Sequence, residues 1–182
     1  GATTDFAYGQ LGVAAYTIEM GTAFFQSCST FESTIYPANL QALLYAAKVV
    51  RTPYMTPAGP DAINLALSES EVIVGQNPTL SATINDTRYS SRNGSEPVQT
   101  ISQAEYYIDT PPWISGATAI PMAAADGSFN SSMEAVTTVV ATSGLTQGRH
   151  TLFIRGKDQA GNWGAVSAIF LTVLRSDNQP PD

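Results

Sequence analysis

Glu19 is the residue of this chain best placed to do chemistry. It ends an apolar run, residues 14–18, whose composition predicts a β-strand. An ionised carboxylate is costly to bury unless it is paired, hydrogen-bonded or bound to a metal, and perturbed carboxylates gather at functional sites. At the end of a core strand, Glu19 is therefore a candidate site residue. The alternative is a strand-end glutamate that reaches solvent.

Together with its flanking residues, Glu19 forms a longer motif. Asp5-Phe6-Ala7-Tyr8 precedes it, the run ends in Thr17-Ile18-Glu19, and residues 24–31 (FFQSCSTF) and 35–40 (IYPANL) follow. In order and spacing, residues 1–55 resemble the last catalytic segment of the zinc carboxypeptidases of the carboxypeptidase A/T (M14) type. The resemblance implies an α/β catalytic domain with a mixed sheet, of which residues 1–60 are the C-terminal remnant.

That resemblance also implies roles for three residues. Glu19 matches the general base that deprotonates a zinc-bound water and passes the proton to the leaving amine, and zinc lowers the pKa of such a water toward ~7. Thr4 and Asp5 match positions that line the pocket for the substrate's C-terminal side chain. Thr4, a small polar residue in place of an acid, is compatible with neutral C-terminal residues. The expected substrates are peptide or protein C-termini.

The zinc ligands of that family are missing from the chain. They comprise two histidines and a glutamate, including a His-x-x-Glu pair, whereas this sequence has one histidine, His150, and no His-x-x-Glu. We therefore expect no residue of this chain to bind the metal, and we expect zinc only in a full-length parent. We expect the chain to be a C-terminal piece of a larger enzyme, inactive alone, with the upstream part of the catalytic domain as its partner.

Composition narrows the class of protein. The net charge is −7, and the eight lysines and arginines are scattered along the sequence, which does not favour nucleic-acid binding. No apolar run approaches the ~20 residues that a membrane span needs. Few charges and many Ser, Thr, Gly, Ala and Asn residues suit a secreted or extracellular bacterial protein, with a periplasmic or cell-surface location as further options.

The sequence pattern changes near residue 60. Residues 38–50 repeat apolar side chains at helical spacing, with Pro37 at the start, and a cluster of prolines and a glycine at 53–60 marks a boundary. Apolar residues then alternate with period two, which predicts six or seven strands and an all-β sandwich over residues 61–174. Residues 175–182 are predicted to be a linker. The alternating sets are Leu65/Leu67, Leu80/Ala82/Ile84, Ala104/Tyr106/Ile108, Val136/Thr138/Val140, Leu152/Ile154 and Ile169/Leu171/Val173.

The last strands carry a second resemblance. His150-Thr151-Leu152 is followed by the turn Asp158-Gln159-Ala160-Gly161-Asn162, and this pair of features resembles a bacterial immunoglobulin-like domain. The resemblance implies an immunoglobulin-like sandwich whose core, without an inter-sheet disulfide, rests on packing.

Other residues have both a functional and a structural interpretation. Asp126, Asp158 and Asn162 could bind calcium, but turn residues more often cap their own backbone. Cys28 could pair with an upstream cysteine or be a small buried residue, and His150 is expected to be a hydrogen-bonded strand residue. The aromatic residues of the sandwich could stack on a sugar, although in small sandwiches they more often pack in the core. These are Tyr106, Tyr107, Trp113 and Trp163.

Two functions follow from the sequence. The first is a fragment of a secreted zinc metallocarboxypeptidase with an appended immunoglobulin-like domain. The second is a non-enzymatic immunoglobulin-like binding or spacer module of an extracellular protein.

Overall fold

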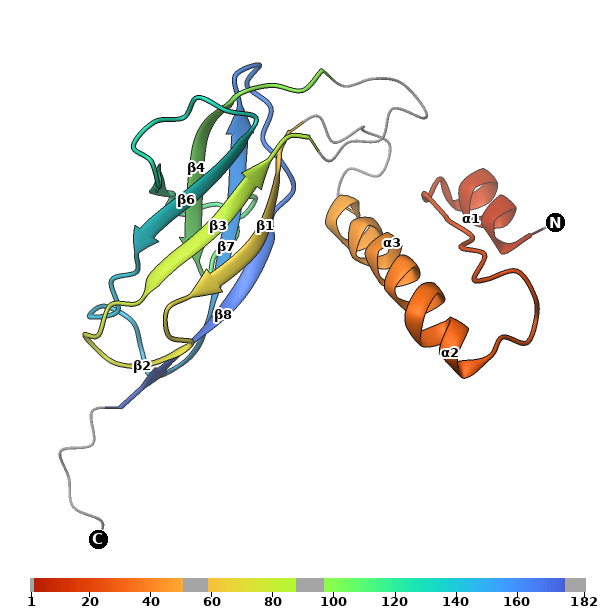
Figure 1. Ribbon diagram of the computed structural model, residues 1–182, viewed down its shortest axis with the longest axis horizontal. Helices are drawn as coiled ribbons and strands as arrows, with labels where there is room; N and C mark the ends of the chain where they lie inside the picture. The colour runs from red at the N-terminus through yellow and green to blue at the C-terminus, as the bar shows by residue number, and fades with distance from the viewer. Residues whose placement is uncertain (1, 51–58, 88–96, 176–182) are drawn as a thin grey trace, which may run out of the picture. The chain divides into compact units, whose positions relative to one another are not determined.

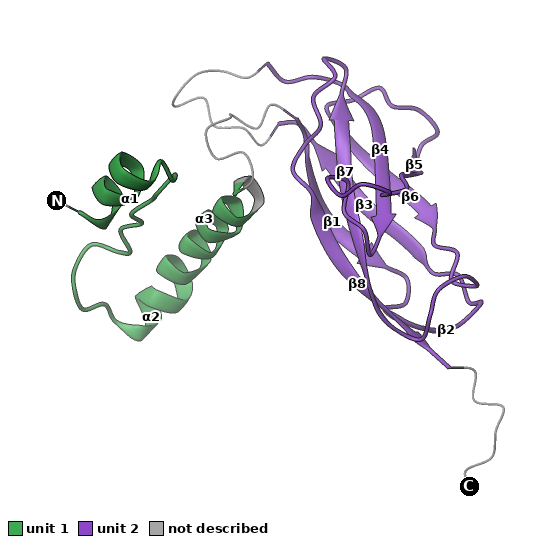
Figure 2. Ribbon diagram, turned by 180° about the vertical axis from the view of Figure 1, so that it is seen from behind, with its two compact units in different colours: residues 1–56 green, residues 57–182 purple. Residues whose placement is uncertain are grey.

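The computed structural model describes residues 2–50, 59–87 and 97–175, the side chains of residues 48 and 49 excepted. The chain divides into two compact units, Gly1–Thr56 and Pro57–Asp182 (Figure 2). The prolines at positions 53 and 57 and the predicted linker beyond residue 175 lie outside the described residues.

The described part of the first unit is helical. Helix α1 (Thr3–Leu11) is followed by an irregular segment, and α2 (Cys28–Thr30), the π-helical turn η1 (Phe31–Ile35) and α3 (Tyr36–Val49) then follow one another without a break (Figure 1). Ser27 caps this longer helix, because its Oγ accepts a hydrogen bond from the Thr30 N–H at 3.1 Å. Pro37 lies in the first turn of α3, directly after the π-helical turn η1. The helix predicted at residues 38–50 is confirmed.

The strand predicted at residues 14–18 is wrong. The described residues of the first unit contain no strand, and α1 occupies part of the segment expected to be a loop. A strand needs a neighbour for its N–H and C=O groups, and residues 2–50 offer no second extended segment to pair with it. The α/β remnant expected from the resemblance is therefore not what this chain forms by itself.

The second unit is an all-β sandwich. Within residues 59–87 and 97–175, eight strands lie in the order β1-β3-β6-β5-β4-β7-β8-β2. Strand β5 links the two layers, because Met122 pairs with Ala104 of β4 while Ala124 pairs with Val136 of β6. Figure 1 shows the two layers of strands. The strands are β1 (Asp61–Leu67), β2 (Glu71–Ile73), β3 (Thr79–Asn85), β4 (Ile101–Ile108), β5 (Ile120–Ala124), β6 (Met133–Val139), β7 (Gly148–Asp158) and β8 (Ser167–Leu174).

The predicted alternation places the core correctly. Leu80, Ile84, Leu152, Ile154 and Leu171 are fully buried between the layers, and each such side chain contributes about 1.5–3 kcal/mol on removal from water. The alternating pattern did not predict the short strands β2 and β5. Strand β2 pairs in parallel with β8 and is the last strand in the order.

No helix within the described residues is long and apolar enough to cross a membrane.

Candidate functional site

Helix α1 positions Thr4 and Asp5 in its first turn. The Asp5 carboxylate accepts a hydrogen bond from the Ala2 N–H at 2.9 Å, so it caps the helix at the end where the helix dipole favours negative charge. Thr4 is half-buried and Asp5 is exposed. The two predicted specificity residues therefore lie side by side on an ordered turn, and one of them also stabilises that turn.

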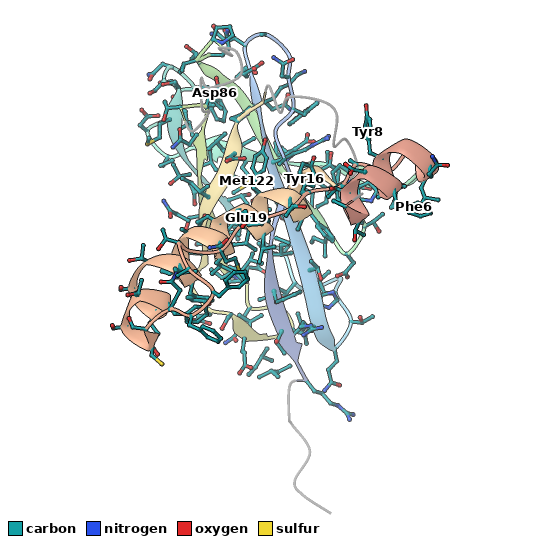
Figure 3. The ribbon with its side chains drawn as sticks, turned by 90° about the vertical axis from the view of Figure 1, so that its right-hand side faces the viewer. Phe6, Tyr8, Tyr16, Glu19, Asp86 and Met122 are labelled. Atoms are coloured by element: carbon teal, nitrogen blue, oxygen red, sulfur yellow. The ribbon has the colours of Figure 1, made fainter. Side chains whose placement is uncertain are left out.

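Gly12 ends α1 and directs the chain toward Glu19. Its φ of 63° lies in the left-handed region, where glycine has no steric penalty. The Val13 N–H donates to the Ala7 carbonyl at 3.0 Å. Glu19 follows in an irregular segment, exposed rather than at the end of a buried strand. Figure 3 shows Tyr16 and Glu19 on this segment, and Phe6 and Tyr8 projecting from α1.

The segment after Glu19 is held against η1. Gly21 has a φ of 79°, and a Cβ at this position would lie 2.9 Å from the Ile35 Cδ1 and the Gln26 Nε2. Ile35 is the buried residue that this close approach covers. A side chain at position 21 would therefore both strain the backbone and push the Glu19 segment away from η1.

An open pocket of about 370 Å³ lies beside this contact, but Glu19 does not line it. Cys28 lines it and is exposed, so the interpretation of Cys28 as a small buried residue is wrong. The lining residues are Met20, Ala23, Phe24, Gln26, Cys28, Phe31, Glu32 and Ile35.

The described residues do not fit a zinc site. They contain no group of three His, Cys, Asp or Glu side chains that could hold a metal ion. Among these residues Glu19 has no hydrogen-bond partner, and it does not contact Thr4 or Asp5 through a hydrogen bond. A complete hydrolytic centre is therefore not assembled by the part of the chain that the structure describes.

His150 is hydrogen-bonded, as expected, and lies at the start of β7. Its Nδ1 is 2.7 Å from the Asp109 Oδ2, and its Nε2 is 2.7 Å from the Thr146 carbonyl oxygen. Asp109, at a φ of 58°, also accepts a hydrogen bond from the Thr151 N–H at 2.9 Å. The hydrogen bond to Thr146, followed by that to Asp109, raises the pKa of His150 against the opposing effect of burial. Both nitrogens face acceptors, which favours the imidazolium.

The turn after β7 is capped by its own residues. Asp158 is fully buried. Its Oδ1 accepts from the Asn162 N–H at 2.8 Å, and its Oδ2 accepts from the Asn162 Nδ2 at 2.9 Å. The carboxylate is thus satisfied without a cation. Asp126 likewise accepts from the Ser128 N–H at 3.1 Å.

The aromatic residues divide between core and surface. Tyr106 is in the core, whereas Trp113 is 44% exposed and makes an edge contact with Phe153. Tyr107 is buried on the outer face of the β4–β7–β8 sheet, where its hydroxyl donates to Glu105 and accepts from the Arg155 Nη2 at 2.8 Å. Burial, followed by the hydrogen bond to Glu105, raises the pKa of Tyr107. Sequence reasoning missed this cluster, because an acid inside an aromatic strand gives no sign of its partner on another strand.

Comparison with known proteins gives structural neighbours of low sequence identity. No family model matches the sequence, and no curated protein matches it either. A solved structure of Clostridium thermocellum CbhA fibronectin(III)-like modules is 13% identical with a TM-score of 0.34, covering 62% of this chain and 96% of that one. The endo-beta-1,4-mannanase from Thermotoga petrophila is 12% identical with a TM-score of 0.39, covering 75% of this chain and 24% of that one. The chain thus spans about a quarter of the mannanase. These similarities are too low to support an activity, and the fold assignment rests on the strand pairing itself.

Proposed function

We propose that residues 1–55 are the closing segment of a secreted zinc metallocarboxypeptidase domain that hydrolyses C-terminal peptide bonds, with Glu19 as the general base. The order and spacing of Asp5, Tyr8 and Thr17-Ile18-Glu19 support the proposal. The structural observation that carries it is the absence of a core in the first unit. Among its described residues only Ile35 is buried.

The exposed side chains of this unit are large and apolar. Phe24 and Phe25 are almost wholly exposed, and Tyr8, Leu11, Tyr16 and Met20 are each more than 60% exposed. So many large apolar side chains exposed within so short a segment are typical of an interface that another part of a domain covers. A segment that contributes its apolar side chains to a larger catalytic domain accounts for this exposure.

Glu19 has the properties that a general base needs. It is exposed and has no ion-pair partner among the described residues, so its carboxylate is available to accept a proton from an attacking water and return it to the leaving amine. The metal that activates the water would have to be bound by residues outside this chain, because the residues described here do not fit a zinc site.

A polypeptide that joins this chain to its metal-binding part tests the assignment. Glu19→Gln keeps the size of the side chain but removes its capacity to accept a proton, so kcat for release of C-terminal residues should fall about 10²–10⁴-fold. Glu32→Gln, an equal charge change on the same unit, is the control and should retain activity. Equal activity of the Glu19 variant and the control would contradict the assigned role.

The proposal also predicts a change of specificity at Thr4. Thr4→Asp should raise kcat/KM for substrates with C-terminal Lys or Arg relative to those with neutral residues, because a carboxylate would then face the substrate's cation. Measurement of kcat/KM on a matched pair of peptides checks this. An unchanged ratio would place Thr4 away from the substrate.

A non-enzymatic role of the immunoglobulin-like module is the second candidate. The outer face of the β4–β7–β8 sheet favours it, because aromatic and basic side chains gather there.

A further inference from the structure

Strand β7 concentrates positive charge on one face. Its residues alternate between buried and partly exposed positions, so Arg149, Arg155 and Lys157 project from the outer face of the β4–β7–β8 sheet. These are three of the eight lysines and arginines of a chain with a net charge of −7. The basic residues scattered in the sequence are thus gathered by the fold.

Arg155 is fixed by its neighbours. Its Nη2 lies 2.6 Å from the Glu105 Oε1, and its guanidinium lies 4.0 Å from the centre of the Trp163 ring. Its charge is neutralised by Glu105. The Arg155 guanidinium therefore packs against the Trp163 ring and holds it in place. We assign Arg155 no direct part in binding.

Arg149 and Lys157 differ from Arg155, because neither has a carboxylate partner among the described residues. The Arg149 guanidinium lies 4.6 Å from the centre of the Phe170 ring, and the Lys157 Nζ lies 5.3 Å from the centre of the Trp163 ring. Each ring restrains the side chain above it. The two cations lie eight residues apart on one side of the strand, or about 26 Å at 3.3 Å per residue.

We propose that this face binds a linear acidic polysaccharide, with Arg149 and Lys157 contacting carboxylates on separated sugar units. The two unneutralised cations are complementary to a repeating anion. Trp113 is 44% exposed and makes an edge contact with Phe153 of β7, so it offers an indole surface on this face, and such surfaces pack against apolar faces of ligands. An acidic peptide fits less well, because extended peptides bind to strand edges through backbone hydrogen bonds, whereas this is the face of a sheet.

Affinity electrophoresis and calorimetry of the 182-residue chain test the proposal, with polygalacturonate as the probe and no divalent cation present. Hydroxyethyl cellulose serves as the neutral polysaccharide, and poly-L-glutamate serves as the acidic peptide. We expect binding to polygalacturonate alone, weakened at least tenfold between 0.05 M and 0.5 M salt because exposed charges are screened.

Single-charge variants locate the site. Arg149→Gln and Lys157→Gln should each weaken binding about fivefold, whereas Arg175→Gln, the same charge change beyond the end of β8, should alter it less than twofold. Unchanged thermal unfolding confirms that each variant is folded. Failure to bind polygalacturonate, tighter binding of poly-L-glutamate, or equal effects of all three variants would overturn the proposal. None of these outcomes depends on carboxypeptidase activity, so the two proposals fail separately.

Discussion

The two units of this chain use apolar residues in opposite ways. In the sandwich, the alternating residues of β3, β7 and β8 are buried between two layers. In the first unit, helix α3 has an amphipathic sequence, yet Leu43, Leu44 and Tyr45 remain about half exposed. The face Leu40/Leu44/Ala47 and residues 13–18 are largely exposed or half-buried. A local pattern is thus enough to form a helix, but a core also needs the elements that pack against it.

The largest expected effect is that one unit folds by itself and the other does not. A polypeptide of residues 57–182 should unfold in one cooperative transition, with a melting temperature within a few degrees of that of the whole chain, because its core is complete. A polypeptide of residues 1–56 should show no cooperative transition. Circular dichroism during heating measures both, and a sandwich that needs residues 1–56 in order to fold would contradict the comparison.

A second prediction concerns the first residues of the sandwich. A Cβ added to Gly164 would overlap the carbonyl oxygen of Pro60, whereas a Cβ added to Gly144 would meet open space. Gly164→Ala should therefore destabilise the sandwich by about 3 kcal/mol, the upper part of the usual range for overpacking. Gly144→Ala should change stability by less than about 1 kcal/mol. Urea unfolding of both variants checks the difference. Equal stabilities would show that Gly59 and Pro60 do not pack on the turn after β7.

A smaller effect concerns His150 and pH. Because the folded-state pKa of His150 is raised above its usual value of 6.5, its contribution to stability is fully present below about pH 6.5 and is lost as the pH rises through the folded-state pKa. The loss should be on the order of 1 kcal/mol, the net contribution of a typical hydrogen bond.

Urea unfolding of the sandwich between pH 5 and pH 9 measures this loss. Asp109→Asn, which removes the carboxylate facing Nδ1, should flatten the profile. A wild-type stability that rises over this range would contradict the assigned hydrogen bonds.

The sequence predicted the sandwich better than the candidate site. Period-two alternation depends on burial between two layers, and both layers lie within the chain, so Leu80, Ile84 and Leu171 were placed correctly. The segment around Glu19 has the composition of a strand, but it forms an irregular segment. The strands with which it would pair are not among the described residues. The cluster of Glu105, Tyr107 and Arg155 was not predictable, because it depends on the register of β4 against β7.

Native-state hydrogen exchange on the whole 182-residue chain tests the central claim most directly. If residues 1–56 lack a core of their own, amides of α1 and α3 should exchange at least about 100-fold faster than those of β3, β4 and β7, which should exchange only through global unfolding. Protection of α1 and α3 equal to that of the central strands would contradict the account, because the first unit would then be a stable domain with no need of a larger catalytic fold.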